Sequence, residues 1–423
     1  MSSCHMSSSS AVPAPPATPT ARVLFLAAAI AVIVSNLYAS QPLIGLIAPA
    51  LGLGPAAASL TTTVTLLGYA AGLVFLVPLI DLVPHRPLIV GTLACAVAAL
   101  LLSIVAPTPA LFLIASAAVG VTTTAVQMLL TVAANLASAT ERGRVVGTAQ
   151  SGIVIGVLLS RPAASLVAEF CGWRAFYGLT AVLIAIIAVV LARMVEARRP
   201  AQRASYPALV RSLGTLIVSE PILRQRALNQ VLLMGAFGAF WTAVALRLAA
   251  PPFDFGQRGI ALFALAGVSG ALIAPLAGRI ADRGWSDRAT TLAHVVAVAG
   301  IVVAGLAADG PWALHASTAW PAASLAALTG AAVLLDLGLF ADQTLGRIAI
   351  NTVRPEARGR LNALYTGLFF IGGAAGAALA GLAWSWQGWA GVCWVGLGFT
   401  LAAVIAGRGT RRQMAPAAVT SRP

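Results

Sequence analysis

Two stretches of the chain, residues 127–173 and 343–389, align without a gap at a constant offset of 216 residues. Of the 47 aligned positions 13 are identical, and the identical residues include Gln, Asn, Arg, Gly and Trp. They run from Gln127 and Gln343 at one end to Trp173 and Trp389 at the other. Because the offset is about half of the 423 residues, one half of the chain is a copy of the other. In a membrane protein, two halves repeated in parallel are typical of a transporter whose substrate site lies between them.

The composition indicates a protein that lives in a lipid bilayer. Hydrophobic residues make up 59% of the chain and charged residues only 9%, whereas soluble domains carry about 25% charged residues. About twelve apolar stretches are each long enough to cross roughly 30 Å of hydrocarbon as a helix. Alternating ten-residue strands typical of outer-membrane barrels are missing. The sequence therefore predicts an all-α integral membrane protein with twelve transmembrane helices in two six-helix bundles.

The expected helices divide the chain into five parts. The first bundle occupies residues 22–194 and the second 226–407, joined by a cytoplasmic linker over 195–225 that breaks the apolar pattern. The cytoplasmic tails are 1–21, which is rich in Ser, Ala and Pro and expected to be disordered, and 408–423. Pro42 and Pro49 favour a bend in the first helix because they remove backbone donors. We expect helices over 22–49, 57–80, 87–106, 110–138, 143–169, 173–194, 226–249, 257–280, 287–308, 321–350, 358–384 and 388–407.

The net charge of +14 reflects membrane topology rather than a nucleic-acid partner. All 26 basic residues are Arg, and 22 of them fall in loops, tails or helix ends that are cytoplasmic if the N-terminus is cytoplasmic. This positive-inside bias predicts a multi-pass protein of the cell (inner) membrane with both termini in the cytoplasm. A nucleic-acid surface would need a folded basic face, whereas these Arg residues are spread over short loops. The exceptions to the bias are Arg161, Arg174, Arg247 and Arg258.

Several functional classes lack the residues that they need. The four cysteines have no metal-ligand spacing, and His294 and His315 are single, so we expect no metal site and no cofactor. An integral-membrane enzyme would need a clustered His, Asp or Cys constellation, and a channel would show symmetric pore-lining rings. The chain has no phosphate-binding loop and no Lys to complete one, which excludes ATP-driven pumping by this chain alone.

The expected loop over 278–288 contains Gly278, Asp282, Arg283 and Gly284, and resembles the G-x-x-x-D-R-x-G-R-[RK] motif of the major facilitator superfamily. The counterpart over 77–86 keeps Asp81 and Arg86 but has Val77 and Pro84 in place of the two Gly residues. The resemblance implies that these cytoplasmic loops latch one packing of the helices and release it in another. The alternative is that they are ordinary polar loop residues.

More narrowly, residues 36–43 resemble the N-x-Y-x-x-Q-P-L opening of a bacterial branch related to drug and sugar exporters. Residues 335–338, 355–362 and 372–373 also resemble that branch, which usually has Asn-Gln where this chain has Gly346 and Arg347. Gly147 and Gly156 keep two places of a Gly- and Pro-rich motif found in drug/proton antiporters, although small residues on such a helix mostly serve close packing. Both resemblances imply proton-coupled export.

Polar residues on the helices that line the cavity in this superfamily are candidates for the substrate site. These helices come from both halves of the chain, as a central site requires. Asn and Gln also hold helices together by hydrogen bonds, which is the alternative for each taken singly. Together they suggest a mostly apolar cavity with scattered hydrogen-bonding groups. The candidates are Asn36, Tyr38, Gln41, Gln127, Asn229, Gln230, Trp241, Gln343 and Tyr365.

Charged side chains at membrane depth are costly and are functional-site hypotheses by default. Asp336 is the candidate for proton coupling because a low dielectric favours the protonated form of a carboxyl group. Arg161 stays charged and is the better anchor for an anionic group. The alternative for both is a structural bond between helices. Asp342 and Arg347 lie nearer the cytoplasmic end, where they could form an interfacial pair.

The sequence thus predicts a secondary active transporter, not an enzyme, that exports a small organic compound such as a drug, sugar or metabolite by alternating access. The proton gradient is the expected energy source. An importer of a sugar, organic acid or amino acid is the main alternative, and an integral-membrane enzyme or a channel is a distant one. The expected partners are the small-molecule substrate and the lipid bilayer. We expect no nucleic acid and a monomeric chain.

Overall fold

The computed structural model describes residues 20–138, 141–195, 205–307, 311–312, 320–354 and 357–414. Within these ranges the regular structure is entirely helical. Several predictions lie outside the described residues: the tail up to residue 19, residues 196–204 of the linker, His315, residues 355–356 and the end of the second tail from residue 415.

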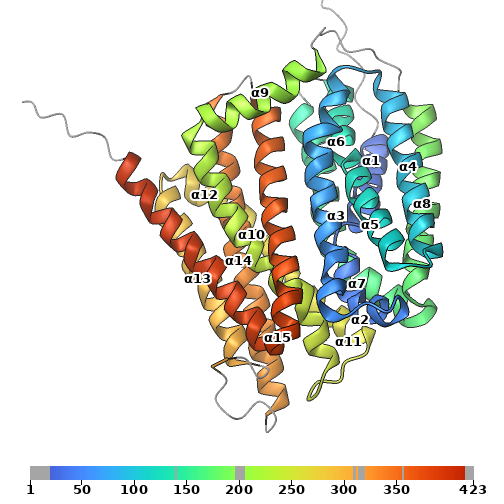
Figure 1. Cartoon of the computed structure of the whole chain (residues 1–423). Helices are drawn as coiled ribbons and strands as arrows, with labels where there is room; N and C mark the ends of the chain where they lie inside the picture. Colours follow the sequence, from blue (N-terminus) through green and yellow to red (C-terminus); the bar gives the residue numbers. More distant parts are fainter. Residues whose placement is uncertain are drawn as a thin grey trace, which may run out of the picture.

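The first half of the chain forms one bundle, at the right of Figure 1. Its helices are close to those predicted: the segment expected at 173–194 is Trp173–Met194, and the one expected at 143–169 is Arg142–Cys171. The elements are α1 (Thr20–Ser35), α2 (Ser40–Ala50), α3 (Pro55–Phe75), η1 (Val77–Asp81), α4 (His85–Val105), α5 (Pro109–Thr123), α6 (Ala125–Leu136), α7 (Arg142–Cys171) and α8 (Trp173–Met194).

The second half forms the bundle at the left of Figure 1, and the linker contributes a helix of its own. This helix, α9 (Tyr206–Ser219), runs across one end of the molecule, and its Tyr206 hydroxyl donates to the carbonyl oxygen of Phe75 in the first bundle at 2.9 Å. The remaining elements are α10 (Pro221–Ala249), α11 (Gln257–Ala264), η2 (Leu265–Val268), α12 (Ser269–Asp282), α13 (Ser286–Leu306), α14 (Pro321–Val353) and α15 (Arg358–Met414).

The predicted bend in the first span lies between α1 and α2, whose axes differ by 40°. Pro42 has no N–H for the carbonyl of Tyr38, and its ring clashes with that carbonyl in a regular helix. Residues 36–39 accordingly form turns rather than α-helix. The break places Tyr38 and Gln41 at membrane depth, next to the junction of the two halves. Irregular backbone at this depth is tolerated where protein or a cavity surrounds it.

The repeat seen in the sequence also appears in the backbone. Gly172 and Gly388, which align at the offset of 216, both have positive φ, +79° and +56°. At Gly172 the chain passes from α7 to α8, and at Gly388 α15 turns back on itself (Figure 1). A second aligned pair, Gly156 and Gly372, packs against a neighbouring backbone in each half, the former on Ala31 of α1 and the latter on Val231 of α10. Glycine allows this close approach because it has no Cβ.

Ten helices of the described chain are long and apolar enough to cross a membrane, or eleven if the bent pair α1–α2 is one span. One of the ten, Arg358–Gly407, contains the non-helical Gly388. The predicted number of twelve is reached only if α1–α2 counts as one span and α15 as two, so twelve stays a prediction. The described helices place the protein firmly in the class of all-α, multi-pass membrane proteins.

The two bundles contact each other along α3 and α15, from Gly367 beside Ala70 to Gly381 beside Ser59. They also meet at the end of the molecule that carries α2 and α11, which we call the closed end, where α7 packs on α11 and α2 on α10. An ion pair joins Glu169 of α7 to Arg258 of α11 at 3.3 Å. Since α7 belongs to the first half and α11 to the second, this pair links the two bundles.

Candidate functional site

A cavity of about 1530 Å³ lies between the two bundles and is lined by both halves of the chain. It is larger than the roughly 300–1,000 Å³ of a typical small-molecule pocket because it extends to the end of the molecule that carries η1 and α9. Its wall from the first half comes mainly from α3, η1, α6 and α7, and its wall from the second half from α10, α12, α14 and α15.

The polar residues of the cavity wall form two stripes that are copies of each other. On α6, Gln127, Thr131 and Asn135 line the cavity, four residues apart and therefore on one helix face. On α14, Gln343, Arg347 and Asn351 line it at the same spacing. Each member of the second set lies 216 residues after its counterpart in the first. The two walls thus differ at one position of the stripe, where α6 has Thr and α14 has Arg.

The inner end of the cavity has an aromatic floor formed by Tyr38, Phe237 and Phe370. The ring centroids of Tyr38 lie 6.2 Å from Phe237 and 6.4 Å from Phe370, and Tyr69 approaches Phe370 at 4.6 Å. The Gln127 amide donates to the Tyr69 hydroxyl at 3.2 Å, which holds this amide against the floor. Aromatic surfaces with one hydrogen-bonding group suit amphipathic ligands.

The outer end of the cavity, which we call the mouth, is lined by His85 and by the charged residues Asp81, Arg142 and Arg360. Asp81 interacts electrostatically with His85 and Arg360. Arg360 also donates to the Ser212 hydroxyl of α9 at 3.1 Å, so the linker helix borders the mouth. Together with Arg347, these are the charged side chains among the described residues that line the cavity.

Behind the aromatic floor, Arg161 of α7 connects the two bundles. Its guanidinium lies 4.3 Å from the ring of Trp241 and 5.2 Å from that of Phe237, both on α10 of the other half. Its Nε donates to Oε1 of Gln41 at 2.7 Å, and its ring contact within its own half is Tyr38 at 4.9 Å. The side chain is only 4% exposed.

Asp336 of α14 completes this cluster. The Trp241 indole donates to Oδ1 of Asp336 at 3.0 Å, and the Asp336 side chain is 1% exposed. Asp336 and Arg161 also interact electrostatically. The face of the Trp241 indole therefore contacts the guanidinium of Arg161 in the first bundle, and its N–H donates to the carboxylate of Asp336 in the second. We call Arg161, Gln41, Trp241 and Asp336 the buried charge cluster.

Of the nine residues predicted for the substrate cavity, Tyr38, Gln127 and Gln343 line it. The other six are buried outside the cavity wall. Asn36 accepts a hydrogen bond from Thr180 of α8 at 3.0 Å, within its own bundle. The Tyr365 hydroxyl lies 3.5 Å from the Gln343 carbonyl oxygen, behind the cavity wall. Gln41 and Trp241 belong to the buried charge cluster, and Asn229 and Gln230 are fully buried on α10.

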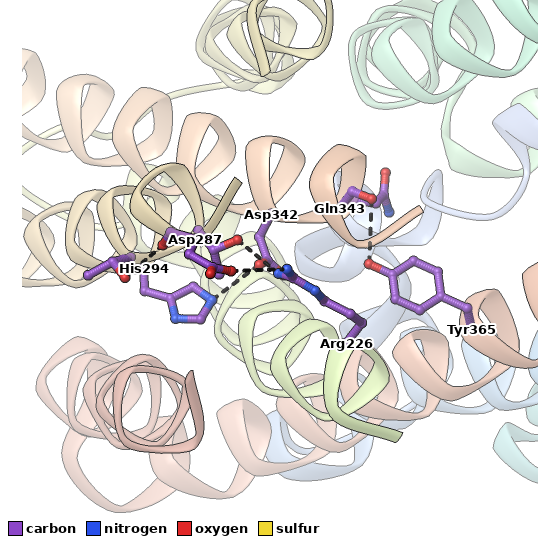
Figure 2. Close-up of polar contacts among 8 residues, drawn as sticks. Arg226, Asp287, His294, Asp342, Gln343 and Tyr365 are labelled. Carbon is purple, nitrogen blue, oxygen red and sulfur yellow. Dashed lines mark hydrogen bonds and ion pairs between the residues drawn. The ribbon is translucent and has the colours of Figure 1, made fainter. Parts of the chain in front are cut away.

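The expected pairing of Asp342 with Arg347 does not occur. Asp342 instead contacts His294 of α13 at 3.2 Å, and both side chains are buried (Figure 2). Nearby, Arg226 of α10 donates to the Thr290 hydroxyl at 2.8 Å and lies 3.9 Å from Asp287. His294, which is single in the sequence, is therefore paired with an acid in the structure. Asp342 and Arg347 are five residues apart on one helix, which puts their side chains on different faces.

The loop residues predicted to act as a latch lie near the same end of the molecule as the mouth. Asp282, Arg283 and Gly284 are exposed at the end of α12, and no ion pair in the described part of the chain involves Asp282. Gly278 lies one turn earlier, with open space where a Cβ would be. Arg86 is exposed on α4. Asp287 contacts Arg226, so it is the acid of this region that ties α13 to α10.

Two repeated helical bundles around a central cavity, in a chain that spans the membrane many times, define a membrane transporter. The family model of the Major Facilitator Superfamily matches residues 24–334, and this chain belongs to that family. The Uncharacterized transporter YgaY of Escherichia coli O157:H7 is 38% identical over 396 residues, which cover 93% of this chain and 97% of YgaY.

Two further comparisons agree with this assignment. The Probable transporter SCO4007 of Streptomyces coelicolor is 33% identical over 435 residues, covering 94% of each chain. The crystal structure of the nucleoside transporter NupG superposes with a TM-score of 0.72 at 13% identity, covering 92% of this chain and 99% of NupG. At this identity the superposition establishes the fold alone.

Proposed function

We propose that this transporter is a secondary active exporter that moves a small organic compound out of the cytoplasm in exchange for protons. The observation that carries the proposal is the cavity between the two repeated bundles, open at the mouth and closed where Glu169 meets Arg258. A site between two repeats that is reachable from one side is one state of alternating access. Rocking of the bundles would close the mouth and open the other end.

The distribution of Arg residues supports one orientation of the molecule in the membrane. The mouth carries Arg142 and Arg360, and the neighbouring loops carry Arg86 and Arg283. Because basic loops resist translocation, the mouth faces the cytoplasm in this proposal, and both termini are cytoplasmic in the inner membrane. The cavity then receives its substrate from the cytoplasm, as an exporter requires. Twelve spans, with α1–α2 as one and α15 as two, keep both termini on this side.

The buried charge cluster supplies the proposed proton site. Asp336 is 1% exposed and has one hydrogen-bond donor, the Trp241 indole, in addition to the charge of Arg161. A carboxyl group in this environment can bind and release a proton, and so lose and regain its negative charge, while it stays at the junction of the bundles. Because Arg161 lies on the other bundle, a change in the charge of Asp336 changes the attraction between the two halves.

Transport into inverted membrane vesicles tests the proposal. A panel of radiolabelled drugs, sugars and metabolites is offered with an acidic vesicle interior, and again after the pH difference has been abolished. Export in the cell corresponds to uptake by these vesicles, so the proposal predicts uptake that requires the pH difference. Uphill movement only in right-side-out vesicles would instead identify an importer. Uptake that is indifferent to the pH difference would refute proton coupling.

A further inference from the structure

We propose that the substrate of this transporter is a small organic anion with an apolar or aromatic body, whose acidic group binds Arg347. The inference rests on the proposed function and deepens it by naming the substrate class. Arg347 is the position at which the two polar stripes of the cavity differ, since its counterpart on α6 is Thr131.

The other deep charges have partners. Arg161 interacts with Asp336 and stacks on Trp241, and Asp342 contacts His294 at 3.2 Å. Pairing lowers the cost of a buried charge, although Nη2 of Arg161 and Oδ2 of Asp342 have no hydrogen-bond partner among the described residues. Neither Arg161 nor Asp342 lines the cavity, so a ligand in the cavity does not reach them.

Arg347 differs from these groups. No ion pair joins it to a carboxylate within the described residues, and its electrostatic neighbours are the hydroxyls of Tyr365 and Tyr69. Its Nε is buried and has no hydrogen-bond partner in the part of the chain that the structure describes. A guanidinium carries five N–H donors in a planar fork that fits a carboxylate or phosphonate with two parallel bonds. Arg347 thus presents unused anion-binding capacity on the cavity wall.

A purely structural role explains Arg347 less well. Cations stabilise a helix when they lie in its last turn, but Arg347 is six residues before Val353, the end of α14. At about 1.5 Å per residue this places it roughly 9 Å inside the helix. Its counterpart Thr131 satisfies itself by donating to the Gln127 carbonyl oxygen at 3.2 Å. The fold therefore tolerates a small neutral residue at the equivalent position.

The rest of the cavity fits the same class of ligand. The mouth has two Arg residues, Arg142 and Arg360, against one acid, Asp81, and an excess of positive charge in a cleft raises the local concentration of anions. The floor is aromatic, which suits an apolar body. A molecule with a single acidic group can place that group on Arg347 while its body rests on the floor. A highly charged phosphate ester has no second cation at that depth.

Ligand binding to the full-length chain in lipid nanodiscs tests the proposal. Matched pairs of compounds compare an acid with a neutral derivative that has the same aromatic body: benzoate and benzamide, 1-naphthoate and 1-naphthamide, phenylphosphonate and its diethyl ester. Affinity is measured by tryptophan fluorescence and thermal stabilisation at about 0.15 M salt, where the field of the exposed mouth is largely screened. We expect at least one acid to bind ten-fold or more tightly than its neutral partner.

Three variants locate the effect. Arg347→Thr installs the residue of the other wall and should reduce the preference for the acid to two-fold or less, while affinity for the neutral partner is kept. Arg347→Lys keeps the charge but loses the planar fork, so part of the preference should remain. Arg174→Thr removes an exposed cation of α8 that does not line the cavity and should leave the preference at ten-fold or more.

Two results would overturn the proposal: an acid that binds no better than its neutral partner in every pair, including a panel in which nothing binds at about 10 mM, or an unchanged preference in Arg347→Thr. Failure of the proposed function is a separate result. Neutral compounds transported without any preference for acids would refute the anion site alone. Acid binding that depends on Arg347 in a protein that transports nothing would refute the transport mechanism alone.

Discussion

Replacing Arg161 by Gln should open the closed end of the molecule. Arg161 sits on α7, and the face of Trp241, 4.3 Å from its guanidinium, belongs to α10 of the other bundle. A desolvated cation–π contact of this kind contributes about 2 kcal/mol. Arg161→Gln removes it together with the attraction to Asp336. Because these interactions cross the junction, their loss should shift the equilibrium roughly 30-fold toward the state in which the bundles part here.

A second Arg of the same bundle provides a matched control. Arg174 lies 4.2 Å from the ring of Trp173, almost the same geometry, but both residues belong to α8 and Arg174 is exposed. Its contact is worth about 0.5–1 kcal/mol and does not cross the junction. Arg174→Gln should therefore lower stability slightly without changing the ratio of the two states.

Distances between spin labels report that ratio directly. In a cysteine-free background, labels at Gly54 on the approach to α3 and at Trp386 on α15 report on the two bundles at the closed end; both positions are exposed. The unmodified protein should give mainly the short distance, and Arg161→Gln should give mainly the long one. If Arg161→Gln and Arg174→Gln both reproduced the unmodified distribution, Arg161 would not hold the bundles together, and the reasoning would fail.

Three further outcomes follow from particular contacts. Gly156→Ala puts a methyl group against the α1 backbone and should destabilise the protein by about 1–3 kcal/mol, whereas Gly147→Ala faces open space and should be neutral in a thermal unfolding assay. Glu169→Gln breaks the 3.3 Å pair with Arg258, which is 65% exposed. Such pairs contribute at most about 1 kcal/mol, so the ratio of short to long label distances should change by about five-fold at most. Asp336→Asn should abolish accumulation driven by a pH difference but preserve energy-independent exchange, and normal uphill transport would assign proton coupling elsewhere.

The membrane helices were predictable because the thickness of the hydrocarbon sets the length of each apolar run, and Gly and Pro residues mark where helices begin and end. The turn at Gly172 separates two apolar runs, and the predicted helix after it has the observed bounds Trp173–Met194. The start of α10 was wrong by five residues, at Pro221 rather than 226. There the polar linker residues continue the helix beyond the apolar run, so hydropathy gives no signal for the boundary.

The rotation of each helix about its axis was much less predictable. A helix that is buried all round has no polar face to orient it, and 83% of the most apolar window of α10 is buried. Trp241, Asn229 and Gln230 on this helix were therefore predicted to line the cavity, and none of them does. Likewise, the contact of His294 with Asp342 joins residues 48 positions apart, and only the packing of α13 on α14 brings them together.

One set of cavity residues was missed although the sequence contains a signal for it. Asn135 and Asn351 are an identical pair in the repeat, eight residues after Gln127 and Gln343. Eight residues are slightly more than two helical turns, so the members of each pair share a face. Applying the helical period to the repeat would have placed both Asn residues on the cavity wall, together with the position occupied by Arg347.

The departures from the repeat carry as much information as the repeat itself. Two walls that were perfect copies would offer the same groups to both ends of a bound molecule, and a ligand could bind in two equivalent orientations. Within the aligned stretches, two deep charges break this equivalence: Arg161 aligns with Ala377, and Arg347 aligns with Thr131. The first is compensated at the junction by Asp336, so it acts between the bundles. The second lies on one wall of the cavity, where the proposed anion site would select a single orientation for a molecule with one acidic end.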